Sequence, residues 1–374
     1  MEEPLRILTV VGARPQFIKA AALSRAISGA FAGRIHQTLL HTGQHYDADM
    51  SAVFFQELGL QAPQVHLGST LASRAHIGRM MAGVERKLEQ PRPDLVLVYG
   101  DTNSTLAGAM AACRMGIPVA HVEAGLRSYE NSRPGEEDRV LTDHGSTWLF
   151  CPTATAVANL AAEGFGGCGD QRPLLKQPLV AMTGDVMLDN TLYYVEHARK
   201  RPVLENLSLR NRPYIVATVH RSGTADDPAT LRGILTTFAA IHASTGAEVV
   251  LPLHPRTARA LPLDEGIGKG IRIISPLGHL DMLALVDGSQ FVITDSGGLQ
   301  KEACFLGKRC LVLRERTEWM ELLENGGVLL VGTDPERILA GAQRMAQDRI
   351  LAVADAFGDG HAAERICTEL LLHR

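Results

Sequence analysis

The segment TDSGGLQKE, residues 294–302, has a spacing that suits phosphate binding. An apolar run precedes Ser296, Gly297 and Gly298, and a helical pattern follows them, so several backbone N–H groups meet at a helix N-terminus. Glycine there lets the backbone approach an anion closely. Glu302 shares a helix face with Gly298, where it could accept hydrogen bonds from ribose hydroxyls. A phosphate or diphosphate site is therefore predicted, and a glycine-rich turn with a purely structural role is the alternative.

Cations and polar side chains follow the first two predicted strands. The segment GARPQFIK places Arg14 directly after the first strand and Lys19 in the first turns of the next helix. Two cations at this position suit a diphosphate, although a turn with surface cations is the alternative. Gln44 and His45 follow the second strand and are a weaker signal for the same edge of the sheet.

Two histidines close predicted strands in the second half of the chain. His220 precedes Arg221, and His254 stands two residues before Arg256. A histidine beside an arginine at a strand end can bind a phosphate or donate a proton. Taken alone, each is as readily an ordinary loop residue.

Two carboxylates follow two further strands, and their pairing suggests proton transfer. Asp101 follows the apolar run 95–99, and Glu123 follows the run 119–122. Neighbouring parallel strands would bring both carboxylates to the same rim. Paired carboxylates in a cleft can hold different pKa values and divide acid and base roles. Asp101 could instead cap a helix that starts near Thr102; glutamate is a poor cap residue, so this alternative suits Glu123 less.

Short apolar runs alternate with helix-length amphipathic stretches along the whole chain. This alternation predicts an α/β fold with two Rossmann-like, doubly wound parallel sheets facing a cleft. We expect an N-terminal domain over residues 1–205 and a C-terminal domain over 206–360. The boundary is expected in the polar stretch 205–213, and a last helix over 361–374 is expected to cross back onto the first domain. The expected strands are 7–11, 37–41, 95–99, 119–122, 148–151, 214–219, 248–253, 271–274, 291–294, 310–313 and 328–331.

The composition excludes several classes of protein. The 374 residues carry a formal net charge of −4, and the pI is near 6.4. This balance argues against a nucleic-acid partner, which would need a basic footprint. No window approaches 18 uninterrupted apolar residues and the N-terminus is acidic, so neither a membrane-spanning helix nor a signal peptide is expected. The six cysteines lack C-x-x-C spacing and mostly fall in apolar runs, which predicts buried thiols in a reducing cytoplasm and no cysteine-based metal site.

Taken together, these segments resemble the non-hydrolysing UDP-N-acetylglucosamine 2-epimerase family. The resemblance is carried, in chain order, by GARPQFIKAA, HTGQHYDADMS, VYGDTNSTLAGA, HVEAGLRS, LTDH, TGDVMLD, ATVHR, LPLHPRT and TDSGGLQKEA. It implies two Rossmann-like domains in the arrangement called GT-B, with UDP bound in the cleft by the second domain. We also expect a cytoplasmic homodimer that acts in cell-surface polysaccharide biosynthesis and needs no cofactor or metal.

The resemblance gives the candidate residues their roles. The cations after the first strand, His220 and the Ser-Gly-Gly run would bind the diphosphate, and Glu302 would bind the ribose. The residues expected to bind the UDP-sugar are Arg14, Lys19, Gln44, His45, Arg139, His220, His254, Ser296, Gly297, Gly298 and Glu302. The residues expected to act in catalysis are Asp101, Glu123, Glu136 and His220.

Two features distinguish this chain within the family. The opening GARPQFIKA, the DTNSTLAGA block and the segment Thr317-Glu318-Trp319 resemble the branch that acts on UDP-2,3-diacetamido-2,3-dideoxyglucuronic acid. Enzymes acting on UDP-N-acetylglucosamine usually carry arginine where Trp319 stands. Family members also usually show Pro-Glu-Glu-x-Asn-Arg where this chain has PGEEDR, so Gly135 occupies the position of a catalytic glutamate. Either a small loop shift lets Glu136 or Glu137 take that role, or the chain handles a different sugar.

The implied reaction is an elimination followed by a re-addition. A C2 proton flanked by no carbonyl is too weakly acidic for simple deprotonation, so a base removes it as UDP leaves C1. UDP then adds back to the glycal after reprotonation on the other face, and the groups around the diphosphate stabilise the developing charge. The resemblance thus predicts an isomerase that inverts C2 of UDP-N-acetylglucosamine or a related UDP-2-acetamido sugar, with UDP-2,3-diacetamido-2,3-dideoxyglucuronate as the alternative substrate. A hydrolysing relative that releases UDP and a GT-B glycosyltransferase are the alternative activities.

Overall fold

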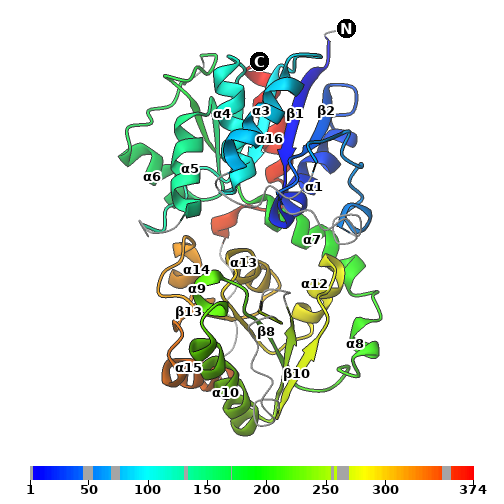
Figure 1. The fold of residues 1–374 in the computed structure, drawn as a ribbon, viewed down its shortest axis with the longest axis vertical. Helices are drawn as coiled ribbons and strands as arrows, with labels where there is room; N and C mark the ends of the chain where they lie inside the picture. Colours follow the sequence, from blue (N-terminus) through cyan, green and yellow to red (C-terminus); the bar gives the residue numbers. More distant parts are fainter. Residues whose placement is uncertain are drawn as a thin grey trace. The chain divides into compact units, whose positions relative to one another are not determined.

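The computed structural model describes residues 3–44, 54–68, 76–129, 134–169, 171–253, 257–258, 269–347 and 355–374. The chain divides into two compact units (Figure 1). The first unit comprises Met1–Asn190 and Asp355–Arg374, and the second comprises Thr191–Ala354.

The first unit is built on a seven-stranded sheet whose neighbouring strands are all parallel, in the order β3-β2-β1-β4-β5-β6-β7. The chain returns to the middle of the sheet between β1 and β4, and ligands of such sheets bind beyond the carboxyl ends of the strands at this point. The strands are β1 (Leu5–Val11), β2 (Ile35–His41), β3 (Val65–His66), β4 (Leu95–Tyr99), β5 (Val119–Val122), β6 (Trp148–Cys151) and β7 (Leu179–Met182).

Helices bury both faces of this sheet. Side chains of a strand alternate between the two faces, and Val96 and Val98 of β4 pack in a core with Val84 of α3 and Ala109 of α4. The helices α3, α4 and α5 pack side by side, and α1 packs on α16. The helices of this unit are α1 (Arg14–Ser28), α3 (Ile77–Leu88), α4 (Asn103–Arg114), α5 (Pro134–His144), α6 (Ala154–Ala162), α7 (Val186–Ala198), the 3-10 helix η2 (Asp355–Phe357) and α16 (Ala362–Leu372).

The second unit repeats the same topology with six parallel strands, in the order β10-β9-β8-β11-β12-β13. Its switch point lies between β8 and β11. The strands are β8 (Tyr214–Thr218), β9 (Glu248–Pro252), β10 (Ile271–Ile274), β11 (Val292–Thr294), β12 (Cys310–Val312) and β13 (Val328–Leu330). The helices are α8 (Val203–Asn206), α9 (Ser222–Ala225), α10 (Pro228–Thr245), α12 (His279–Asp287), α13 (Gly297–Phe305), α14 (Met320–Glu324) and α15 (Pro335–Gln347).

Two doubly wound parallel sheets were predicted from the sequence, and this prediction is confirmed. Every expected strand overlaps an observed one, whereas β3 and β7 were not expected. The strand β3 has only two residues, which is too short for a sequence pattern, whereas β7 is a short apolar run that lies partly buried at the edge of the sheet.

The division between the units differs from the expected stretch 205–213. Along the chain, the first unit ends at Asn190 and the second begins at Thr191, inside α7. The polar stretch is no boundary because α8, which leads into it, packs on α12 of the second unit. Nearby, the guanidinium of Arg201 pairs with Asp281 at 2.7 Å from Nε to Oδ1.

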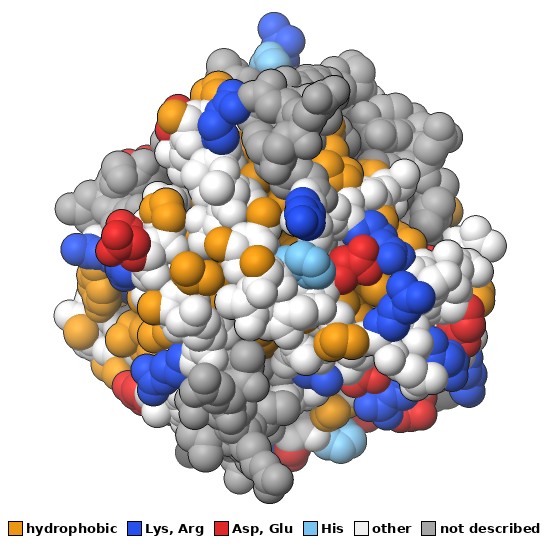
Figure 2. All heavy atoms as spheres, turned by 90° about the horizontal axis from the view of Figure 1, so that it is seen from below, with side chains coloured by type: hydrophobic (Ala, Val, Ile, Leu, Met, Phe, Trp, Pro, Cys, Tyr) orange, Lys and Arg blue, Asp and Glu red, His pale blue; other side chains and the backbone are white. Residues whose placement is uncertain are grey.

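The surface shows no strong bias of charge on the face drawn in Figure 2, where described acidic and basic side chains lie among apolar and uncharged ones. In the described part of the chain, no helix is both long and apolar enough to span a bilayer. All six cysteines are free thiols, and those at positions 151, 304, 310 and 367 are buried.

Candidate functional site

Four charged side chains of the first unit form a continuous series of ion pairs at the carboxyl ends of β4 and β5. Lys19 Nζ, from α1, lies 2.5 Å from Glu123 Oε2. Arg139, from α5, lies 3.4 Å from Glu123 Oε1 through Nη1 and 3.2 Å from Asp101 Oδ2 through Nη2. Asp101 is partly exposed, while the other three side chains are almost fully buried. The structure thus brings the two predicted carboxylates to one arginine.

The backbone that delivers these side chains is unusual. Glu123 has φ of 76°, a conformation that a residue with a side chain seldom adopts. Such positions persist only where the surroundings enforce them, and they cluster at functional sites. Gly100 also has a positive φ, of 67°, and an added Cβ there would stand 3.0 Å from Lys19 Nζ. Both turns are therefore shaped around the ion pairs.

Asp101 is not the N-cap of the helix α4 that follows it. The N-cap of α4 is Thr102, whose side chain accepts a hydrogen bond from the backbone N–H of Thr105. A helix cap was the alternative role for Asp101, but in the structure the cap is its neighbour Thr102. The Asp101 carboxylate is consequently available to pair with Arg139.

Gly135 and Glu136 are the second and third residues of α5, and they contact different parts of the site. The carboxylate of Glu136 accepts hydrogen bonds from the N–H and Oγ of Ser128, at 2.8 and 2.9 Å, and from the N–H of Tyr129 at 3.1 Å. An added Cβ on Gly135 would stand 2.9 Å from Asp101 Oδ2. Position 135 is therefore in contact with the predicted catalytic carboxylate, while the Glu136 side chain holds the loop that follows β5.

Gln16 was not among the predicted site residues, but its side chain connects two strand ends at the site. Its Oε1 accepts hydrogen bonds from the N–H groups of Gly12 and Ala13, at 2.8 and 3.0 Å. Its Nε2 donates to the carbonyl of Tyr99 at 3.2 Å and to Thr105 Oγ1 at 3.0 Å. It thereby joins the ends of β1 and β4, and its place inside GARPQFIK was the available signal.

The remaining candidates of the first unit lie near the same strand ends. Arg14 is the first residue of α1, and its guanidinium carbon lies 4.3 Å from the ring centroid of Phe54. Gln44 Oε1 accepts hydrogen bonds from the N–H of Ser104 at 3.0 Å and from its Oγ at 2.6 Å. His45 and His254 lie outside the described residues.

The second unit contains the segment that was predicted to bind an anion. Gly297 and Gly298 are the first two residues of α13, and Ser296 is its N-cap, with Oγ accepting from the N–H of Leu299. The N-terminus of a helix with exposed N–H groups favours a negatively charged ligand. An added Cβ on Gly297 would stand 2.6 Å from Glu318 Oε1, so a side chain there would need Glu318 to move.

Asp295 connects this helix start to His220. Its Oδ1 lies 2.6 Å from His220 Nδ1, and its Oδ2 accepts from the N–H groups of His220 and Arg221, at 2.9 and 2.8 Å. Burial favours a raised pKa for Asp295, but the hydrogen bonds and the charge of His220 outweigh burial and lower the pKa. The His220 side chain is 37% exposed, so the ring that Asp295 orients reaches the surface of the unit. Asp295 stands beside Ser296 in the sequence but was not among the predicted site residues.

Glu302 lies in α13 beyond the two glycines and is buried. Its Oε1 is 3.8 Å from Nδ1 of His279, which begins α12. On the same helix, Nζ of buried Lys301 lies 3.7 Å from the centroid of the Trp319 ring. The segment that departs from the family pattern at Trp319 therefore contacts the helix that carries the predicted anion site.

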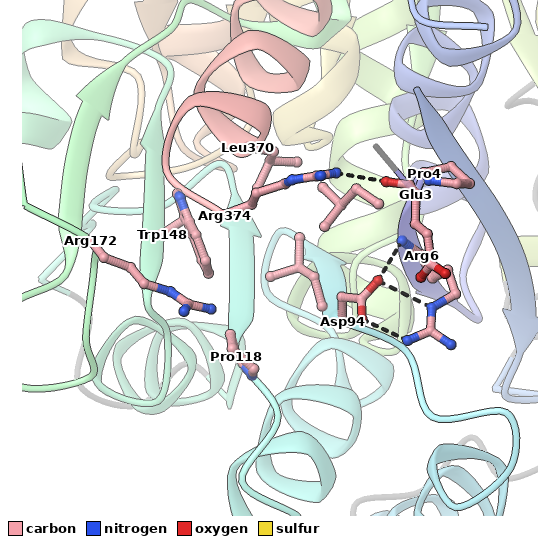
Figure 3. A pocket seen from close by; sticks show the side chains of 11 residues that line it. Glu3, Pro4, Arg6, Asp94, Pro118, Trp148, Arg172, Leu370 and Arg374 are labelled. Carbon is pink, nitrogen blue, oxygen red and sulfur yellow. Dashed lines mark hydrogen bonds and ion pairs between the residues drawn. The ribbon is translucent and has the colours of Figure 1, made fainter. Parts of the chain in front are cut away.

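The first unit also has a cavity of about 270 Å³ (Figure 3). It lies at the amino ends of the strands, opposite the carboxyl ends that carry the ion pairs. It is lined by residues at the amino ends of strands, among them Leu5, Leu95 and Trp148, and by Leu370 of α16. Arg6 and Asp94 pair at its wall, with 2.8 Å between Nη2 and Oδ1. None of the predicted site residues lines this cavity.

Comparisons of the sequence and of the structure with known proteins agree on one family. The family model described as UDP-N-acetylglucosamine 2-epimerase matches residues 30–371. A Pseudomonas aeruginosa protein, UDP-2,3-diacetamido-2,3-dideoxy-D-glucuronate 2-epimerase, is 41% identical over 98% of this chain and 99% of its own length. The crystal structure of Methanocaldococcus jannaschii UDP-GlcNAc 2-epimerase in complex with UDP-GlcNAc and UDP matches with a TM-score of 0.86 and 34% identity, over 98% of this chain and 99% of that one.

A more distant structure shares the fold alone. Phytolacca americana UGT2, solved with UDP-2fluoro-glucose and pterostilbene, matches with a TM-score of 0.60 at 11% identity, over 98% of both chains.

Proposed function

Because the chain belongs to the UDP-N-acetylglucosamine 2-epimerase family, we propose that it inverts C2 of a UDP-2-acetamido sugar by eliminating UDP and adding it back. Its relatives are named 2-epimerases, and it is an isomerase of that kind. The observation that carries the proposed chemistry is the contact of Arg139 with both Asp101 and Glu123.

The two carboxylates are suited to move the C2 proton. One of them, acting as a base, takes the proton from C2 while the C1–O bond breaks and its electrons leave with UDP. A proton is then returned to C2 on the opposite face, and the diphosphate oxygen attacks C1 again. Arg139 holds Asp101 and Glu123 together, so that the acid and the base are positioned before the substrate binds.

The groups proposed to hold UDP are cations, a histidine and a helix N-terminus. Lys19 and Arg14 supply positive charge in the first unit. In the second unit, Ser296 begins the helix whose N–H groups suit the diphosphate, and His220 is oriented by Asp295. These groups stabilise the charge that develops on UDP as it leaves. Glu302, further along α13, is proposed to accept hydrogen bonds from the ribose.

UDP-N-acetylglucosamine is the proposed substrate, and UDP-2,3-diacetamido-2,3-dideoxyglucuronate is the alternative. The alternative is favoured by the Pseudomonas aeruginosa relative and by Trp319, which stands where the UDP-N-acetylglucosamine enzymes usually carry arginine. The proposals that rest on the family resemblance alone are a homodimer, a cytoplasmic location and a role in cell-surface polysaccharide biosynthesis.

Incubation of the protein with each UDP-sugar in D2O tests the reaction. Deuterium at C2 with UDP still attached to the sugar supports the epimerase. Free UDP in stoichiometric amount would indicate a hydrolysing enzyme. No change in any UDP-sugar would contradict the proposal and leave a glycosyltransferase as the alternative.

A further inference from the structure

A fully buried histidine lies directly beneath the two candidate carboxylates. His121 is on β5, two residues before Glu123, and its side chain has no exposed surface. Its Nε2 is 2.8 Å from the carbonyl oxygen of Gly100, and its Nδ1 is 2.7 Å from Asp143 Oδ1. The ring therefore spans from the end of β4 to α5.

Both partners of the ring accept hydrogen bonds. A carbonyl oxygen has no proton to give. Burial favours a raised pKa for Asp143, but hydrogen bonds and charges from His121 and Arg127 outweigh burial and lower it. Apart from the ring, Asp143 Oδ2 receives Arg127 Nη1 at 2.8 Å and the N–H of Gly125 at 3.2 Å, and these two contacts alone favour an ionised carboxylate. Both ring nitrogens must then donate, and a ring that donates twice carries a positive charge.

The surroundings compensate this charge. Arg127 is itself bound by Glu163, with 2.6 Å between Nε and Oε1 and 2.8 Å between Nη2 and Oε2. The charges thus alternate from His121 through Asp143 and Arg127 to Glu163, which is 30% exposed. A buried charge is tolerated when it is paired and hydrogen-bonded in this way.

The proton on Nε2 holds the turn that follows β4. Gly100 donates its N–H to the carbonyl of Val122 at 3.0 Å and accepts from His121 at its own carbonyl, so its two neighbouring peptide groups are both fixed. An added Cβ on Gly100 would stand 3.0 Å from Lys19 Nζ and 3.4 Å from Glu123 Oε1. Any movement of this turn would displace Asp101, the next residue, and press on the Lys19–Glu123 pair.

We propose that His121 is a buried imidazolium, held by Asp143, that positions the Asp101 turn and the Glu123 turn for proton transfer. The positioning role rests on the proposed epimerase function, whereas the charge of the ring does not. His121 acts through the Gly100 carbonyl and does not touch the sugar.

Nitrogen NMR of protein labelled with ¹⁵N-histidine measures the ring's charge directly. At about pH 8 an unperturbed histidine is neutral. We expect one buried histidine with both ring nitrogens protonated, and its signals should be lost in His121→Gln and shifted in Asp143→Asn. A neutral His121 ring would overturn the proposal. This measurement needs no substrate, so it stands apart from the outcome of the test for epimerase activity.

Kinetics test the positioning role. We expect His121→Gln to lower kcat for C2 exchange by about 10²-fold, the cost of a reacting group misplaced by a distant change, with a much smaller change in KM. The matched control is His36→Gln, at an exposed position in β2 of the same sheet. Wild-type kcat in a folded His121→Gln would overturn the proposal. If this variant fails to fold, Asp143→Asn is measured in its place, with the same two outcomes.

Discussion

Gly135 lies so close to Asp101 that an added Cβ would stand 2.9 Å from Asp101 Oδ2 and 3.2 Å from the Asp101 backbone oxygen. A carboxylate oxygen of Asp101 thus lies against the position where the family pattern has a glutamate. The departure from the family sequence therefore coincides with a direct contact to a candidate catalytic residue.

Gly135→Ala is expected to lower kcat for C2 exchange by roughly 10²-fold, because the methyl group would push the Asp101 carboxylate away from Arg139. The melting temperature should change little, since the displaced atom ends a partly exposed side chain. The control is Gly78→Ala in α3, where nothing lies within 4 Å of an added Cβ. Unchanged turnover in Gly135→Ala would show that this contact does not govern Asp101.

Asp101→Asn is expected to abolish most turnover while UDP binding stays near normal. Loss of a proton-transferring group costs roughly 10²–10⁴-fold in rate. Single-turnover C2 exchange and UDP titration by calorimetry measure the two properties separately. Near wild-type exchange would reduce Asp101 to a structural partner of Arg139.

Glu136 and Glu137 are expected to differ when each is changed to glutamine. The Glu136 carboxylate binds Ser128 and Tyr129, and the family resemblance leads us to expect it to act in catalysis, so Glu136→Gln should reduce C2 exchange. Glu137 is exposed and serves as the matched comparison. Both variants are assayed with UDP-N-acetylglucosamine and with the diacetamido uronate. Normal exchange in both variants contradicts the idea that either glutamate replaces the one absent at Gly135.

Glu302→Ala is expected to weaken the stabilisation of the protein by UDP. A ligand that binds only the native state raises the free energy of unfolding by about 2.7 kcal/mol at a hundredfold excess over Kd. Melting curves at several UDP concentrations measure this effect, with Glu324→Ala in α14 as the control. An unaltered UDP-dependent shift in Glu302→Ala would remove Glu302 from the nucleotide site.

Asp295 is expected to contribute to stability against acid. The hydrogen bonds and the charge of His220 lower its pKa below the ordinary range of an aspartate in the folded state. A carboxyl group whose pKa is lowered by folding stabilises the folded protein at pH values above its pKa in the unfolded chain. This contribution is lost as the pH falls through the pKa of the folded state. The melting temperature of the wild type should therefore fall between about pH 5 and pH 2 more steeply than that of Asp295→Asn. Parallel curves for the two proteins would contradict this assignment.

The sequence was most informative where burial is complete. The strands β4, β5 and β6 are buried along their whole length, and their apolar runs predicted their bounds. The edge strand β7 is also apolar in sequence, but it is only partly buried, and it was not among the expected strands. The polar stretch 205–213 resembled a domain boundary because its composition says nothing about the packing of α8 on α12.

The candidate site was predicted as a set of strand ends, and its internal contacts were not. Asp101 and Glu123 were expected on one rim, but the bridging arginine geometry depends on how α5 packs. His121 and Asp295 were overlooked because each lies inside a motif whose neighbours drew attention, and their function depends on partners distant in sequence. Such contacts arise from tertiary packing and leave no local pattern.

The helix α16 is made after the whole second unit, yet it packs on α1 of the first unit and buries Ile366 and Cys367. During synthesis, residues 1–190 leave the ribosome long before this helix exists. The apolar surface of α1 that α16 covers in the folded protein therefore stays exposed in the nascent chain, where other molecules can bind it. The first unit is completed last, and a chain arrested before residue 355 would carry a finished second unit beside an unfinished first one.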